Sequence, residues 1–138
     1  MGTVEDFNRR STGRLPEYLG MVVTEVAEGR MVIQLEITSH LLAPNGYLHA
    51  GTVVSLADTA AGYGCVAHLP EHATGFTTIE LKSNHIGTAR DGTIVATATP
   101  AHIGRTTQVW DSVVRHAQSG KTIALFRCTQ MILSSKKP

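Results

Sequence analysis

The chain contains 138 residues, 42% of them hydrophobic and 17% charged, a composition typical of one globular domain, which we expect to span residues 1–138. Its formal net charge of +1 argues against binding to nucleic acids or to an anionic membrane surface. No apolar run is long enough to cross a membrane, and acidic residues occur too early for a signal peptide, so we expect a cytoplasmic protein.

The first part of the chain changes from a helical to a strand-like pattern. Residues 1–19 predict one or two short helical turns, whose apolar side chains are expected to dock on the domain: Phe7, Leu15, Tyr18 and Leu19. Residues 21–27 and 30–38 then alternate between apolar and polar, as in two strands joined by a tight turn at 28–29. One face of the second strand is apolar: Met31, Ile33, Leu35 and Ile37.

A long apolar helix is expected over residues 51–68, after a break at 39–46. One carboxylate, that of Asp58, lies inside this helix among valine, leucine and alanine. An ionised carboxylate in such surroundings is costly unless it is paired or used, so Asp58 is a candidate functional residue. The alternative is a solvated aspartate on the surface.

Four more strands are expected after the helix, at residues 77–85, 93–102, 106–116 and 122–133. Asp-Gly at 91–92 and Ser-Gly at 119–120 are interpreted as two hairpin turns, and the polar tail 134–138 is expected to be loose. This order of elements predicts an α+β fold, in which one long helix lies across an antiparallel sheet.

The cysteines and histidines give no sign of a disulfide or a metal site. Cys65 and Cys128 each lie in an apolar stretch, which indicates two buried thiols in a reducing compartment. The seven histidines are scattered, and no CxxC or HExxH motif is present. We therefore expect neither a metal nor another cofactor.

Residues 45–58 combine a turn, the sequence His-Ala-Gly and an aspartate nine positions after the histidine. With the order of elements, this spacing resembles the hotdog-fold thioesterases, in particular the phenylacetic-acid-degradation-type (PaaI-like) acyl-CoA thioesterases. The matching positions are Gly46, His49, Ala50–Gly51, Leu56–Ala57–Asp58, 78–84 and 87–92. The resemblance implies a curved antiparallel sheet wrapped around the long helix, and hydrolysis of an acyl- or aryl-CoA thioester to a carboxylic acid and CoA.

The chain departs from the family pattern at two positions. The family usually has a glycine directly after the histidine, where this chain has Ala50, whose backbone N–H remains available. The family also has a polar residue six positions before the histidine, where this chain has Ala43. Asn45 lies two positions later and is not equivalent in spacing.

The resemblance implies that Asp58 is the general base, or the nucleophile, directed at the thioester carbon. It also implies that the backbone N–H of Ala50, at the helix start formed with Gly51, stabilises the negative charge on the carbonyl oxygen. A helix N-terminus suits this role because it has free N–H groups and the positive end of the helix dipole. A compact strand-to-helix turn without catalytic function is the alternative.

Three further residues carry two interpretations each. Thr78 corresponds to a hydroxyl that orients the carboxylate or its water, or else it is an ordinary strand residue. His49 contacts the thioester carbonyl or the leaving sulfur, or else it caps the helix. Asn45 is first a turn residue and second a ligand contact.

Coenzyme A, the leaving group implied by the resemblance, carries phosphates that favour arginine and lysine at the rim of a site. The candidates for this contact are Lys82, Arg90 and Arg105, although each alone is also an ordinary surface cation. Trp110 and Phe126 occupy strand positions and are expected in the core or in an interface.

The resemblance also implies a homodimer with two sheets joined edge to edge, and a homotetramer formed by two such dimers. Asp58 of one subunit would then face the His49 turn of the other. Two alternative functions keep the fold: hydration or dehydration of an acyl thioester, whose characteristic motif is not found, and acyl-CoA binding without catalysis, which the loss of a polar residue at Ala43 supports.

Overall fold

The computed structural model describes residues 1–135. In chain order the elements are α1 (Val4–Ser11), α2 (Leu15–Tyr18), β1 (Val22–Ala27), β2 (Arg30–Glu36), a 3₁₀ turn (Ser39–Leu41), α3 (Ala50–Ala67), β3 (Ala73–His85), β4 (Thr93–Ile103), β5 (Thr107–His116) and β6 (Thr122–Ser134). This order confirms the predicted one. Of the tail expected to be loose, Ser134 still belongs to β6, and residues 136–138 lie outside the described residues. None of the described helices is long and apolar enough to cross a membrane.

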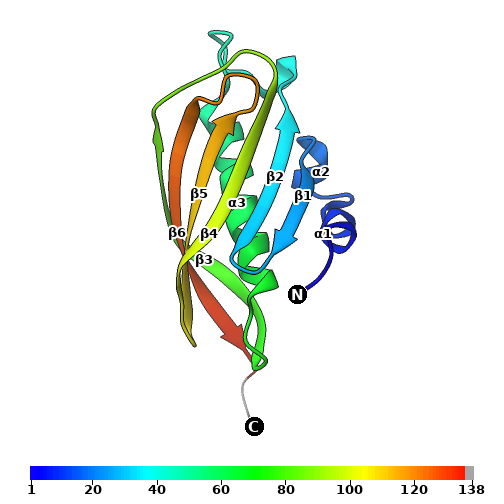
Figure 1. Ribbon diagram of the computed structural model, residues 1–138, viewed down its shortest axis with the longest axis vertical. Coiled ribbons are helices and arrows are strands. Elements are labelled where there is room, and N and C mark those ends of the chain that lie inside the picture. The colour runs from blue at the N-terminus through cyan, green and yellow to red at the C-terminus, as the bar shows by residue number, and fades with distance from the viewer. Residues whose placement is uncertain (136–138) are drawn as a thin grey trace.

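The six strands form one antiparallel sheet in the order β1-β2-β4-β5-β6-β3. Helix α3 lies across one face of this sheet (Figure 1) and contacts five of its strands: β2, β4, β5, β6 and β3. The predicted hotdog arrangement is therefore confirmed. Two of the expected turns are confirmed as well, since Gly29 and Gly120, each with a φ of 72°, join β1 to β2 and β5 to β6.

The hairpin expected at Asp91 and Gly92 is wrong. Gly92 does form a turn, with a φ of 90°, but the strands before and after it are not neighbours. Strand β3 pairs with β6 at one edge of the sheet, whereas β4 pairs with β2 and β5. The Asp-Gly signal reports local backbone geometry, and the strand partner is decided by which apolar faces can be buried together over α3.

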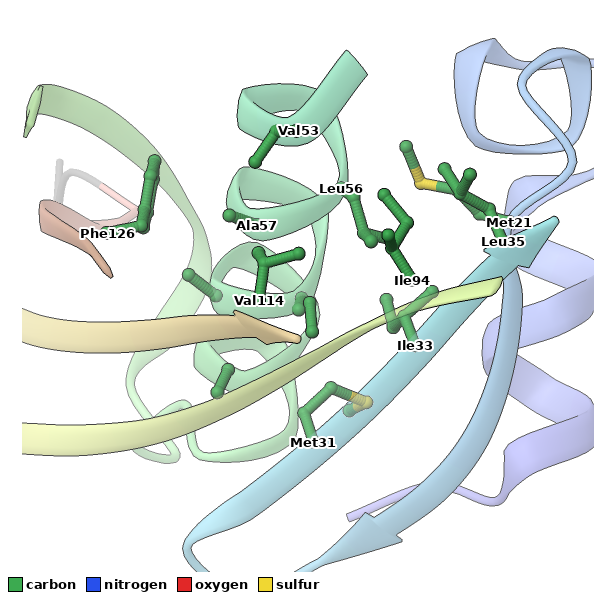
Figure 2. Packing of buried hydrophobic residues seen from close by; sticks show 14 of the residues in the cluster. Met21, Met31, Ile33, Leu35, Val53, Leu56, Ala57, Ile94, Val114 and Phe126 are labelled. Atoms are coloured by element: carbon green, nitrogen blue, oxygen red, sulfur yellow. The ribbon is translucent and has the colours of Figure 1, made fainter. Parts of the chain in front are cut away.

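Alternation along the strands directs one set of side chains at α3. The predicted apolar face is buried, with Met31, Ile33 and Leu35 in β2 and Ile37 directly after it. Leu56 reaches from α3 toward this strand and toward Ile94 of β4, as Figure 2 shows. Trp110 and Phe126 are also buried, which confirms their placement in the core. Full burial of one large apolar side chain contributes about 1.5–3 kcal/mol, so this layer is the main source of stability.

A chain of hydrogen bonds holds the C-terminal end of α3. The Trp110 indole N–H donates to Gln108 Oε1 over 2.8 Å, and Gln108 Nε2 donates to the backbone carbonyl of His68 over 3.0 Å. His68 Nε2 accepts from the backbone N–H of Gly29 over 2.8 Å. The indole also lies so close to Gly64 that an added Cβ there would come within 2.6 Å of the ring.

The N-terminal segment docks through α1. Phe7 is buried, and the centroids of its ring and the Tyr63 ring lie 5.2 Å apart. Leu19 packs against the core as well. The expected docking of two other side chains is wrong, because Leu15 is 58% and Tyr18 82% exposed. Helix α2 is a single turn of four residues, so it cannot direct all its side chains to the same side.

Candidate active site

His49 and the two residues after it form the start of α3. His49 is the N-cap, and its Nδ1 accepts a hydrogen bond from the backbone N–H of Gly51 over 2.7 Å. An added Cβ at Gly51 would come within 2.9 Å of Nδ1, so a side chain there would displace the imidazole from this position. The backbone N–H of Ala50 has no hydrogen-bond partner among residues 1–135. The turn thus presents one N–H without a partner, on the exposed residue Ala50, at the positive end of the helix dipole.

A cavity of about 350 Å³ lies beside this turn and is bordered by Ala50, Ala43 and Asn45. Asn45 Oδ1 accepts the backbone N–H of Tyr47 over 3.1 Å, so the side chain has the turn-forming role that the sequence favoured, at the edge of the cavity. His85, at the end of β3, also borders the cavity and was not identified from the sequence.

Asp58 lies in the middle of α3 and is half-buried. Its Oδ1 is buried and has no hydrogen-bond partner within the described residues. Burial raises the pKa of this carboxyl above its ordinary value, because the charged form loses water. Asp58 is therefore not a fully solvated surface residue, and it forms no ion pair with any of residues 1–135.

Asp58 borders a second cavity, of about 200 Å³, together with Arg10, Tyr63, Phe76 and Thr78. The structure therefore brings Thr78 to the same cavity as Asp58, which the orienting role implied by the resemblance would require. The Thr78 hydroxyl, however, donates to Gln130 Oε1 over 2.6 Å. Gln130 was not identified from the sequence.

The two cavities are separate within one chain. Ala50 and Asp58 are eight residues apart on α3, which places them about 12 Å apart along the helix axis. Asp58 borders one cavity and Ala50 the other. A single chain thus presents two halves of the expected site rather than one assembled site.

The three cations expected to bind CoA phosphates are not gathered in one chain. The Arg90 guanidinium stacks on the Tyr47 ring, 4.2 Å from its centroid, and Tyr47 borders the cavity beside Ala50. Arg105 follows β4 and Arg90 precedes it, so the 11 residues of β4 place them at opposite ends of the sheet, about 35 Å apart. Lys82 is exposed on β3, opposite Arg127 of β6.

Other reactive groups are inert or dispersed. Within residues 1–135, no three histidine, cysteine, aspartate or glutamate side chains gather in a way that could hold a metal ion. Cys65 and Cys128 are free and buried, as expected, and burial raises the pKa of each thiol to about 12. Neither thiol is therefore a nucleophile at neutral pH.

Comparison with known proteins identifies the family. A family model described as the thioesterase superfamily matches residues 45–123, more than half of the chain, including the His49 turn and all of α3. The chain is 34% identical, over 123 residues, to the 1,4-dihydroxy-2-naphthoyl-CoA hydrolase of Listeria monocytogenes, covering 89% of this chain and 98% of that protein.

Two solved structures are similar over nearly their whole length. Thioesterase HI1161 from Haemophilus influenzae has a TM-score of 0.91 at 25% identity, covering 97% of this chain and 92% of the other. The Escherichia coli PaaI protein from the phenylacetic acid degradation operon has a TM-score of 0.84 at 25% identity, covering 95% and 92%. The chain therefore belongs to the thioesterase superfamily and is a thioester-hydrolysing enzyme with the hotdog fold.

Proposed function

We propose that this enzyme hydrolyses an acyl- or aryl-CoA thioester to the carboxylic acid and free CoA, with Asp58 as general base or nucleophile. The observation that carries the proposal is the half-buried Asp58 carboxylate, which borders a cavity and has an oxygen without a partner within the described residues. A carboxylate kept in that state destabilises the fold, and catalysis explains why it is present.

The proposed chemistry uses Ala50, at the start of α3, and Asp58, in the middle of the same helix. Asp58 takes a proton from a water whose oxygen adds to the thioester carbon, or the carboxylate adds directly and water hydrolyses the resulting anhydride. In both courses the carbonyl oxygen gains negative charge, which the free N–H of Ala50 stabilises, and one such donor typically lowers the barrier by about 3 kcal/mol. The carbon–sulfur bond then breaks, and CoA leaves and takes up a proton as the free thiol.

His49 assists at the same turn. Because Nδ1 accepts the Gly51 N–H, the neutral ring carries its proton on Nε2. That N–H can donate to the thioester carbonyl or to the leaving sulfur. Asn45 contributes mainly by shaping the turn, since its side-chain oxygen bonds to the Tyr47 N–H.

Two copies of the chain are needed to assemble one site. Asp58 and Ala50 border different cavities, so we place Asp58 of one subunit against Ala50 of the partner subunit. Strand β3 supports this arrangement: it is a 13-residue edge strand with one unpaired backbone side, and its Ile79 and Leu81 are exposed. Pairing two β3 strands gives an edge-to-edge homodimer, and two dimers give the homotetramer.

The cavity at Asp58 suits an aromatic or short acyl group. It measures about 200 Å³ and is bordered by Phe76 and Tyr63, and a cavity of about 150 Å³ in another protein holds benzene. The relative named a 1,4-dihydroxy-2-naphthoyl-CoA hydrolase is consistent with an aryl substrate. Arg90 on Tyr47, with Lys82 and Arg105 supplied across subunits, would bind the CoA phosphates.

Free thiols and a CoA thioester substrate both fit a reducing cytoplasm, where we place the enzyme. The proposed chemistry calls for no metal or other cofactor, because Asp58 serves as the base or nucleophile and the Ala50 N–H as the oxyanion donor.

One observation favours a non-catalytic acyl-CoA-binding protein as a second candidate. Ala43 borders the cavity beside Ala50 without offering a polar group. A thioesterase from Staphylococcus aureus was crystallised with a glutamine and, separately, a glutamate replaced by alanine, at positions 15 residues apart. Ala43 and Asp58 have the same separation, so by spacing this chain naturally has alanine where that relative has glutamine.

The test is the release of free thiol from short, medium, long and aromatic acyl-CoAs by the wild type and by Asp58→Asn. Asp111→Asn serves as control, because that carboxylate is paired with Arg127 on β6. We expect hydrolysis by the wild type and by the control, and a loss of orders of magnitude in Asp58→Asn. Tight binding of CoA thioesters without any thiol release would instead favour the binding protein.

A further inference from the structure

Gln130 of β6 is a buried residue whose amide is only half satisfied. It lies on the face of the sheet that packs against α3, opposite Thr78 of β3. Its Oε1 accepts the Thr78 hydroxyl over 2.6 Å, whereas its Nε2 is buried and has no partner among residues 1–135. An unsatisfied buried donor is costly, so its presence calls for a physical reason.

A second unsatisfied atom lies in the same region. Asp58 Oδ1 is buried without a partner in the described chain, and Asp58 and Thr78 border the same cavity. Burial and then the nearby Asp58 charge raise the pKa of Cys128, which lies two residues before Gln130 on the same face of β6. The residue with a free donor, Gln130, therefore bonds to the Thr78 hydroxyl, and the residue with a free acceptor, Asp58, borders the same cavity as Thr78.

The neighbouring buried glutamine shows what a fixed amide requires. Gln108 lies opposite Gln130 on β5. Its Oε1 accepts from the Trp110 indole, and its Nε2 donates to the His68 carbonyl, so only one orientation satisfies both partners. Gln130 bonds to a hydroxyl alone, and a hydroxyl can either donate or accept. Its amide can therefore turn over by about 180° and keep its bond to Thr78.

We propose that Gln130 is a positioning residue that directs the Thr78 hydroxyl toward Asp58. With Nε2 turned toward Thr78, the amide donates to Oγ1, and the hydroxyl proton becomes free to point into the cavity that Asp58 borders. There it donates to the ionised carboxylate or to the water beside it. Before this reversal two atoms, Gln130 Nε2 and Asp58 Oδ1, lack partners, and after it only Gln130 Oε1 does. This inference rests on the proposed role of Asp58 in thioester hydrolysis.

Loss of the hydrogen bond from the Thr78 hydroxyl to Asp58 should change the pH dependence of activity, which a purely structural role of Gln130 would not. A hydrogen bond to the ionised carboxylate favours the charged form. Without this hydrogen bond, Asp58 becomes protonated at a higher pH, and the acid limb of the kcat/KM profile shifts to higher pH. The Michaelis constant is expected to stay near the wild-type value, because Gln130 is buried behind Thr78 and does not reach the substrate.

The test compares Gln130→Met and Thr78→Val, which remove the amide and the hydroxyl while keeping volume, with Thr78→Ser, which keeps the hydroxyl. We expect kcat to fall roughly tenfold in the first two and the acid limb to rise by about half a pH unit or more. Thr78→Ser should stay close to the wild type. The double variant Gln130→Met/Thr78→Val should lose no more than either single variant, because both act through one hydroxyl.

Gln108→Met is the matched control, since it removes a buried glutamine whose bonds lead to Trp110 and His68 instead. It should lower stability and leave the pH profile unchanged. If Gln130→Met does not fold, Gln130→Leu replaces it, because it removes the amide without adding a charge or an O–H donor near Asp58.

The outcomes separate this inference from the proposed function. A wild type that hydrolyses thioesters, with activity lost in Asp58→Asn but an unshifted acid limb in Gln130→Met, overturns the positioning role and leaves the thioesterase intact. Additive losses in the double variant overturn it as well. A wild type that releases no thiol overturns both.

Discussion

His49 Nδ1 accepts a hydrogen bond from the backbone N–H of Gly51 over 2.7 Å, within the first turn of α3. The contact satisfies one of the N–H groups that a helix start leaves free. It also fixes the proton of the neutral imidazole on Nε2, because the accepting nitrogen carries no hydrogen. Capping and substrate contact, the two interpretations of His49, therefore use different ring nitrogens and are compatible.

Two substitutions of His49 separate these roles. Asparagine is a good N-cap and lacks the outer N–H, so His49→Asn should keep the stability of the wild type within a few tenths of a kcal/mol and lose activity by about tenfold or more. His49→Ala should lose the same activity and about 1 kcal/mol of stability. Thermal unfolding and thiol release measure the two effects, and full activity in His49→Asn would leave capping as the sole role.

Asp58 should make the protein less stable at neutral pH. Burial raises its pKa in the folded state above the ordinary value of 3.8 that the unfolded chain has. The folded state then binds this proton more tightly, so the penalty is full above the raised pKa and vanishes below the ordinary one. Asp58→Asn should raise Tm at pH 7, with a gain that shrinks as the pH falls through this window. A gain independent of pH would contradict the argument.

Gly64 should not tolerate a side chain. An added Cβ would lie 2.6 Å from Trp110, whose indole is buried and held by Gln108. Gly64→Ala should therefore cost about 1–3 kcal/mol in urea unfolding. Gly75→Ala is the matched control, because no atom lies within 4 Å of the added Cβ there. Equal stability of the two variants would show that the indole moves aside freely.

Strand β3 should be the dimer edge. Ile79 is 53% exposed on this edge strand, and Ile79→Lys should give a monomer in sedimentation velocity and reduce activity at least a hundredfold, because the proposed site is shared by two subunits. Val22→Lys is the control on the opposite edge strand, β1, where Val22 is 48% exposed. A fully active monomer would exclude a shared site.

Local patterns were sufficient to predict most of the fold. The alternation in β2 placed Met31, Ile33 and Leu35 on the buried face, and the long apolar run of α3 identified its central helix. Asp58 stood out because a carboxylate conflicts with an apolar helix, and its burial follows from that helix lying inside the sheet. These features depend on neighbours within a few residues, which sequence periodicity reports directly.

The remaining features depend on contacts between distant residues. The Asp-Gly turn at 91–92 could not reveal that β3 crosses to the far edge, since strand choice is set by the assembled core. Thr78 and Gln130 are 52 residues apart, and only the β3–β6 register places them opposite each other. His85 likewise reaches the cavity beside Ala50 because β3 ends there.

Both ends of α3 are fastened by directional bonds, while its middle is rich in alanine and glycine. At one end Thr52 Oγ1 donates to the Leu41 carbonyl over 3.0 Å, and at the other His68 joins the Gly29 turn. The middle of the helix is held by packing, as between Gly64 and Trp110, and the bonds at its two ends add directional restraints. Because hydrogen bonds hold both ends of α3, the helix is fixed on the sheet and sets the spacing between Ala50 and Asp58. In the proposed homodimer, two symmetry-related copies of α3 would give both sites the same spacing between these residues.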